Sequence, residues 1–167
     1  MTQRLAPDLC VIGAGSGGLS VAAGAAQMGA EIVLIERGLM GGDCLNFGCV
    51  PSKSLLAAAR RAYLSRRGAA LGITAAPSQI DFAAVADSVQ EVIATIAPND
   101  SVERFERLGV KVLREEARFT GPRTVCAGAV EIRPRRFALE SSPRRLPPER
   151  HEPESFSRVR HPRSRGG

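Results

Sequence analysis

Residues 8–18, D-L-C-V-I-G-A-G-S-G-G, decide the fold of this chain. The short apolar run Asp8 to Ile12 predicts a strand, and the glycines after it predict a tight turn into a helix of small residues. A second apolar run, Ile32 to Ile35, predicts the next strand and ends at Glu36. Strand, tight turn, helix and strand in this order predict an α/β fold.

The turn itself matches the pattern G-x-G-x-x-G that binds dinucleotides. In that pattern Gly13 makes the sharp turn, Gly15 lets a pyrophosphate approach, and Gly18 lets the helix lie close to the sheet. The first turn of the helix offers free N–H groups and a positive dipole end to phosphate. Glu36 lies about 20 residues further on, where an acid binds a ribose hydroxyl. A glycine-rich turn without a ligand is the alternative reading.

A second motif runs from Cys44 to Lys53 and reads C-L-N-F-G-C-V-P-S-K. In a regular helix its two cysteines would be separated by a rise of about 7.5 Å, beyond the roughly 7 Å limit for a disulfide. A bridge therefore needs a distorted turn, which Gly48 and Pro51 make less costly. We interpret the motif as a redox-active dithiol; a pair of small buried residues is the alternative.

The stretch Ser54 to Arg67 has a helical apolar pattern, so the cysteines should lie at the start of a helix. That position and the neighbouring Lys53 are both expected to lower a thiol pKa. Cys10 and Cys126 fall within strand patterns and are expected to be ordinary buried thiols.

Apolar residues at spacings of three and four predict an amphipathic helix from Phe82 to Ile96, with Asp81 as its N-cap. A loop is expected before it, at Ala75 to Ile80, and a shorter helix after it, at Ser101 to Leu108. The strands expected beyond that helix are Val110 to Leu113, Ala117 to Phe119 and Val125 to Ile132.

Charge is distributed unevenly along the chain, which has a net charge of +6. From Met1 to Ile132, 13 Lys and Arg balance 13 Asp and Glu, whereas ten Arg oppose four Glu from Arg133 onward. We therefore predict a domain at 1–140 and a disordered Arg/Pro-rich tail at 141–167. The tail lacks interleaved aromatic residues, so no specific nucleic-acid partner is expected.

Cysteine and apolar content exclude several other classes of protein. Four cysteines among 167 residues are too sparse for a disulfide scaffold, and no close C-x-x-C pair predicts a metal site. No apolar run reaches the roughly 18 residues of a membrane span. A soluble cytoplasmic protein without a membrane partner is expected.

The glycine turn, Glu36 and the segment Gly41 to Lys53 together resemble the flavin-dependent pyridine nucleotide-disulfide oxidoreductases. The resemblance covers roughly Leu5 to Phe137. The family includes dihydrolipoamide dehydrogenase and mercuric reductase, and the stretch Ile96 to Phe105 is similar to the mercuric reductase-like branch. It implies a Rossmann-like FAD-binding domain with a parallel sheet, flanking helices and a small antiparallel β meander.

The resemblance also implies roles for individual residues. Cys49 would face the flavin as the charge-transfer thiol, Cys44 would attack the substrate, and Lys53 would lie beside the isoalloxazine. Glu36 would hold the adenosine ribose, and Ala117 would offer backbone to the adenine. The complete set of expected cofactor contacts is Gly13, Gly15, Ser16, Gly18, Glu36, Arg37, Gly42, Asp43, Lys53 and Ala117.

The activity implied is electron transfer from NAD(P)H through FAD and the Cys44–Cys49 pair to a disulfide or a metal ion, in a homodimer. Family members are several hundred residues long and carry an A-T-G turn after the strand matching Arg136 to Leu139, where this chain has Glu140, Ser141 and Ser142. We therefore expect a truncated or frameshifted chain, impaired in turnover.

Two other readings stay open at this level. One is a non-catalytic nucleotide-binding module whose basic tail recruits a partner. The other is a nicotinamide-dependent dehydrogenase, which is disfavoured because it leaves the dithiol without a role.

Overall fold

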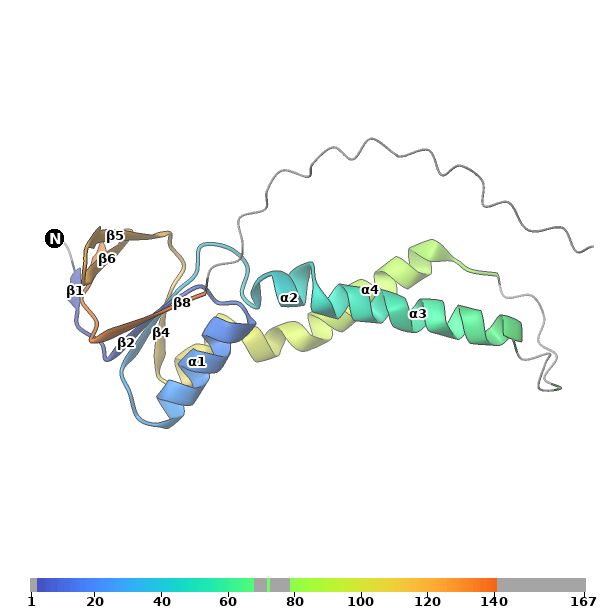
Figure 1. Ribbon diagram of the computed structural model, residues 1–167, viewed down its shortest axis with the longest axis horizontal. Helices are drawn as coiled ribbons and strands as arrows, with labels where there is room; N and C mark the ends of the chain where they lie inside the picture. Colours follow the sequence, from blue (N-terminus) through green and yellow to red (C-terminus); the bar gives the residue numbers. More distant parts are fainter. Residues whose placement is uncertain (1–2, 68–71, 73–78, 141–167) are drawn as a thin grey trace, which may run out of the picture.

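The structure is a computed structural model that describes residues 3–67, 72 and 79–140. In this part of the chain two four-stranded sheets pack against each other, helix α1 lies beside one of them, and a pair of helices extends away (Figure 1). The expected tail at 141–167 and most of the expected loop at Ala75 to Ile80 lie outside the described residues.

The central sheet is entirely parallel, as the βαβ pattern predicts. Its strand order is β4-β3-β2-β8. The bounds are β2 Leu9–Ile12, β3 Ile32–Ile35, β4 Val110–Leu113 and β8 Arg136–Leu139. Helix α1, Ser16–Gln27, crosses from β2 to β3. The carboxyl ends of all four strands therefore meet at one edge, where ligands bind in open α/β sheets.

Alternating side chains of the central sheet enter two different cores. Val11 and Leu34 contact α1 and the buried Phe105 of α5, Val102–Arg107. Their neighbours Cys10 and Val33 face the second sheet. Because both faces are covered, β3 is fully buried and reads as an unbroken apolar run.

The second sheet contains the predicted meander and one unpredicted strand. Its order is β1-β7-β6-β5, with β1 parallel to β7 and the other pairs antiparallel. The bounds are β1 Gln3–Leu5, β5 Ala117–Gly121, β6 Thr124–Ala127 and β7 Val130–Ile132. The single strand predicted for Val125 to Ile132 is therefore wrong, because Gly128, with φ +55°, turns the chain back between β6 and β7.

Two helices form an arm that extends from the sheets (Figure 1). They are α3, Cys49–Arg67, and α4, Phe82–Ile96, and they contact each other. The bounds predicted for α4 are confirmed, and Asp81 caps it by accepting from Ala83 N at 3.0 Å and Ala84 N at 3.1 Å.

Neither helix of the arm has a buried residue. The large apolar side chains left exposed on it are Leu55, Leu56, Tyr63, Leu64, Phe82 and Val92. The short 3-10 helix η2, Ala97–Asp100, joins α4 to α5. Within the described residues, no helix combines the length and apolar character needed to cross a membrane.

Candidate functional site

The glycine-rich turn at the end of β2 has little room for side chains. Gly13 has φ +104°, which favours glycine over all other residues. A Cβ added to Gly18 would meet the Gly13 carbonyl oxygen at 2.0 Å, so α1 lies directly against the turn. Glu36, directly after β3, stabilises the turn, because its carboxylate accepts hydrogen bonds from Ala14 N at 2.7 Å and from Gly38 N at 2.6 Å.

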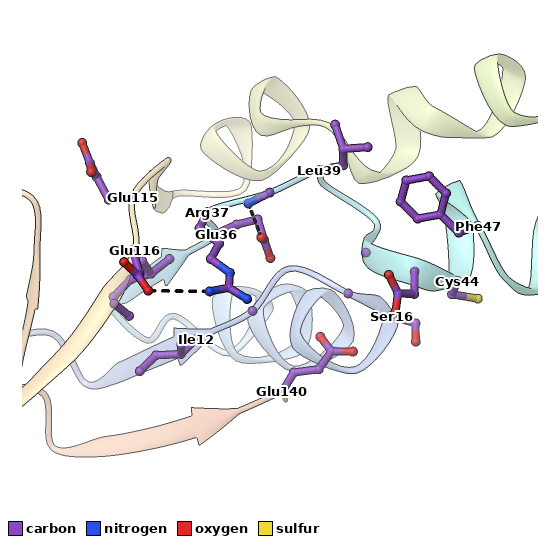
Figure 2. A pocket seen from close by; sticks show the side chains of 17 residues that line it. Ile12, Ser16, Glu36, Arg37, Leu39, Cys44, Phe47, Glu115, Glu116 and Glu140 are labelled. Carbon is purple, nitrogen blue, oxygen red and sulfur yellow. Dashed lines mark hydrogen bonds and ion pairs between the residues drawn. The ribbon is translucent and has the colours of Figure 1, made fainter. Parts of the chain in front are cut away.

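A pocket of about 900 Å³ opens at this edge of the central sheet (Figure 2). It extends from the glycine-rich turn past the end of β3 to Cys44. Its lining consists of Ile12, Gly13, Gly15, Ser16, Ile35, Glu36, Arg37, Gly38, Leu39, Gly42, Asp43, Cys44, Phe47, Glu115, Glu116, Ala117 and Glu140.

Most residues predicted for the site gather in this one pocket. Those on the lining are Gly13, Gly15, Ser16, Glu36, Arg37, Gly42, Asp43, Cys44 and Ala117. Gly18 is buried behind the turn, while Cys49 and Lys53 are exposed on α3 and do not contribute to the lining.

The two cysteines lie on either side of a break between two helices. Cys44 belongs to α2, Gly42–Asn46, and Cys49 is the first residue of α3. The distortion expected from their spacing lies between the helices, at Gly48, where a Cβ would meet the Asp43 carbonyl oxygen at 2.9 Å. Pro51 fits in the first turn of α3 because an N–H there has no partner within the helix.

Both cysteines are free thiols in this structure, so their pairing stays a proposal. The expected lowering of the thiol pKa is wrong for Cys44. Its pKa is raised, first because its side chain hydrogen-bonds with Cys49 and then because burial disfavours the thiolate. The charge of Lys53 acts in the predicted direction and lowers the pKa of Cys44, but it is outweighed.

The other two cysteines differ from each other. Cys10 is fully buried between the sheets, as predicted, and burial raises its pKa to about 12. Cys126 is only partly buried and lies 3.8 Å from the hydroxyl of Thr120, so its description as a buried thiol is wrong. Both lie outside the pocket lining.

Sequence reasoning missed three acidic residues on the pocket lining: Glu115, Glu116 and Glu140. Glu116 forms an ion pair of 3.6 Å with Arg37, drawn as a dashed line in Figure 2. The pKa of Glu116 is lowered, first by a hydrogen bond from Arg118 and then by the charges of both arginines. The departure from A-T-G at Glu140 was the one available signal in the sequence for these residues.

Glu140 shows that the glycine-rich turn accepts an anion. Its carboxylate accepts from Gly17 N at 3.0 Å and from Gly18 N at 2.7 Å, in the first turn of α1. A Cβ on Gly15 would meet the same carboxylate at 2.5 Å, so the space that this glycine leaves open holds a negative group. The donor set and the open space therefore fit a phosphate group.

The parallel sheet, the glycine-rich turn and the carboxylate after β3 define a Rossmann-like domain. A family model described as "Pyridine nucleotide-disulphide oxidoreductase" matches residues 7–156. The chain belongs to this family.

Curated relatives carry two different names. A mercuric reductase from Lysinibacillus sphaericus is 30% identical over 132 residues, which cover 79% of this chain and 24% of the relative. A dihydrolipoyl dehydrogenase from Geobacillus stearothermophilus is 37% identical over 119 residues, covering 71% of this chain and 25% of the relative. The chain thus spans about a quarter of the length of these relatives.

Proposed function

We propose that this chain binds FAD in the pocket at the edge of the central sheet and that Cys44 and Cys49 form a redox pair beside it. One observation carries the proposal: Cys44 lines the same pocket as the glycine-rich turn. A dinucleotide with its pyrophosphate at the turn and its adenosine toward β5 would direct its redox-active ring toward the thiols. Bound FAD would supply a carrier of two electrons.

Different residues of the pocket would contact different parts of FAD. Gly13, Gly15 and the first turn of α1 would hold the pyrophosphate, and the Glu36 carboxylate would accept from a ribose hydroxyl. Ala117, partly buried at the start of β5, would present backbone to the adenine. Further contacts proposed on the same lining are Ser16, Arg37, Gly42 and Asp43.

The thiols would exchange electrons with the substrate by forming and opening a disulfide. When Cys44 and Cys49 join, two electrons and two protons leave the pair, and they return when it is reduced. By the resemblance of the motif, Cys44 is proposed as the thiol that attacks the substrate and Cys49 as the thiol that faces the flavin, although in this structure Cys44 and not Cys49 lies on the pocket lining. The pKa of Cys44 is raised, first by its hydrogen bond with Cys49, and the charge of Lys53 opposes this rise without overcoming it.

The donor and acceptor are proposed from the comparisons. The pyridine nucleotide in the description of the family supports NAD(P)H as donor, and the relatives named dihydrolipoyl dehydrogenase and mercuric reductase support a disulfide or a metal ion as acceptor. A homodimer in the cytoplasm belongs to the same proposal.

The test is to refold the 167-residue chain with excess FAD, remove free flavin, and record the visible spectrum before and after dithionite. The expected result is retained flavin that bleaches on reduction, together with two more titratable thiols after reduction of the oxidised protein. The Cys44→Ser variant should retain flavin but lose this thiol response. A folded chain that retains no flavin would overturn the proposal.

A further inference from the structure

The residue after the last strand of the central sheet occupies the glycine-rich turn. The backbone N–H of Glu140 donates to the Ile12 carbonyl oxygen at 2.9 Å, which continues the pairing of β8 with β2. From there its side chain reaches the first turn of α1, as Figure 2 shows. Both carboxylate oxygens are used there, one by Gly17 N and the other by Gly18 N.

These two N–H groups are the donors that a pyrophosphate would need. The carboxylate also fills the approach over Gly15, where an added Cβ would meet Oε1 at 2.5 Å and Cδ at 2.8 Å. Two anions cannot share one pair of donors, and at such short separations their charges repel each other. Glu140 and a pyrophosphate therefore exclude each other from the turn.

We propose that Glu140 is a competitor for the dinucleotide built into the chain. Its carboxylate holds the N–H groups of the turn and has to leave them before a pyrophosphate can bind. This inference rests on the proposed function, because it concerns the affinity of the same pocket. Apparent affinity falls in proportion to the fraction of molecules whose turn is free, so occupancy of about nine in ten weakens binding about tenfold.

The contact with the turn depends on the side chain alone. Replacing Glu140 leaves the backbone bond to Ile12 available, so the end of β8 can remain in place. Glu140→Gln removes the charge and keeps one acceptor oxygen, whereas Glu140→Ala removes the contact altogether. A matched control is Glu106→Gln, which makes the same change of charge on the exposed surface of α5, away from the pocket lining.

The experiment measures FAD binding by flavin fluorescence in the 167-residue chain and its three variants. Glu140→Ala should bind with a Kd about tenfold lower than the unchanged chain, Glu140→Gln with an intermediate Kd, and Glu106→Gln with an unchanged one. Inorganic pyrophosphate, followed by the rise in Tm, should give the same order. If Glu140→Ala fails to fold, Glu140→Gln still decides the test.

Equal Kd values across the unchanged chain and both Glu140 variants would overturn the inference while the proposed function stands. Weaker binding by the Glu140 variants would also overturn it, because Glu140 would then assist the dinucleotide. A different order with pyrophosphate would show that the carboxylate does not compete for the phosphate donors. If the folded unchanged chain binds no FAD, the proposed function fails, and the inference fails with it.

Discussion

Alanine at Gly18 should give a less stable protein than alanine at Gly24, although both glycines lie in α1. At Gly18 a Cβ would lie 2.0 Å from the backbone carbonyl oxygen of Gly13, whereas ordinary contact begins at 3.4 Å. A backbone atom cannot rotate aside, so the helix and the turn must separate. At Gly24 the added Cβ would meet no atom of the described chain within 4 Å apart from the adjacent residues and backbone of α1 itself.

The magnitudes follow from these two environments. Forcing an extra methyl into a packed region costs about 1–3 kcal/mol. Replacing glycine by alanine within a helix gains about 0.5–1 kcal/mol when the space is free. We expect Gly24→Ala to be more stable than the unchanged chain by about that gain. Gly18→Ala should be less stable than Gly24→Ala by about 1–3 kcal/mol, because only Gly18→Ala carries the steric cost.

Urea unfolding followed by circular dichroism at 222 nm gives both free energies of unfolding. With slopes of about 1–3 kcal/mol per molar urea, a difference of this size moves the midpoint by about 1 M. Equal midpoints for the two variants would refute the reasoning, because the helix gain would then be the same at a crowded and an open position. A lower midpoint for Gly24→Ala would refute it as well.

Three further changes should have defined outcomes. Leu34→Ala should lower the free energy of unfolding by about 2–5 kcal/mol in the same urea assay, because Leu34 is fully buried in β3. The control Leu39→Ala, at a residue that is 56% exposed, should lower it far less. Asp81→Ala should destabilise α4 by about 0.5–2 kcal/mol and reduce the helical circular dichroism signal, whereas Asp81→Asn should retain most of both. Cys49→Ala should lower the pKa of Cys44, because it removes the hydrogen bond that raises this pKa most. Alkylation of Cys44 by iodoacetamide, measured by mass spectrometry, should then begin at lower pH. An unchanged or higher pH of onset would contradict the assigned cause.

The central sheet was predictable because its pattern follows from burial. Ile32 to Ile35 is apolar at every position since helices cover one face of the sheet and a second sheet covers the other, and the predicted bounds are confirmed. The bounds of α4 are also confirmed, since its apolar residues recur at helical spacing and Asp81 caps it. The turn at Gly128 was missed because one glycine interrupts an otherwise strand-like run.

Much of the lining of the candidate site could be predicted, because glycines and cysteines at fixed spacing have few other uses. The pKa values and charge contacts of the site could not be predicted from the sequence. The raised pKa of Cys44 depends on a thiol that only the break at Gly48 brings near. The contact of Glu140 joins residues separated by 122 positions, and no local pattern encodes where its side chain points.

The arm formed by α3 and α4 is expected to unfold locally more easily than the two sheets. The two buried cores are formed by residues of the sheets, α1 and α5, whereas no residue of α3 or α4 is buried, so the arm is expected to open while the sheets stay folded. Cys49 lies at the root of this weaker part. Cys44 precedes Leu45, which is 4% exposed and belongs to α2, a helix that contacts α1. The two thiols therefore lie on either side of the junction between α2 and the arm, and local opening of the arm would separate them.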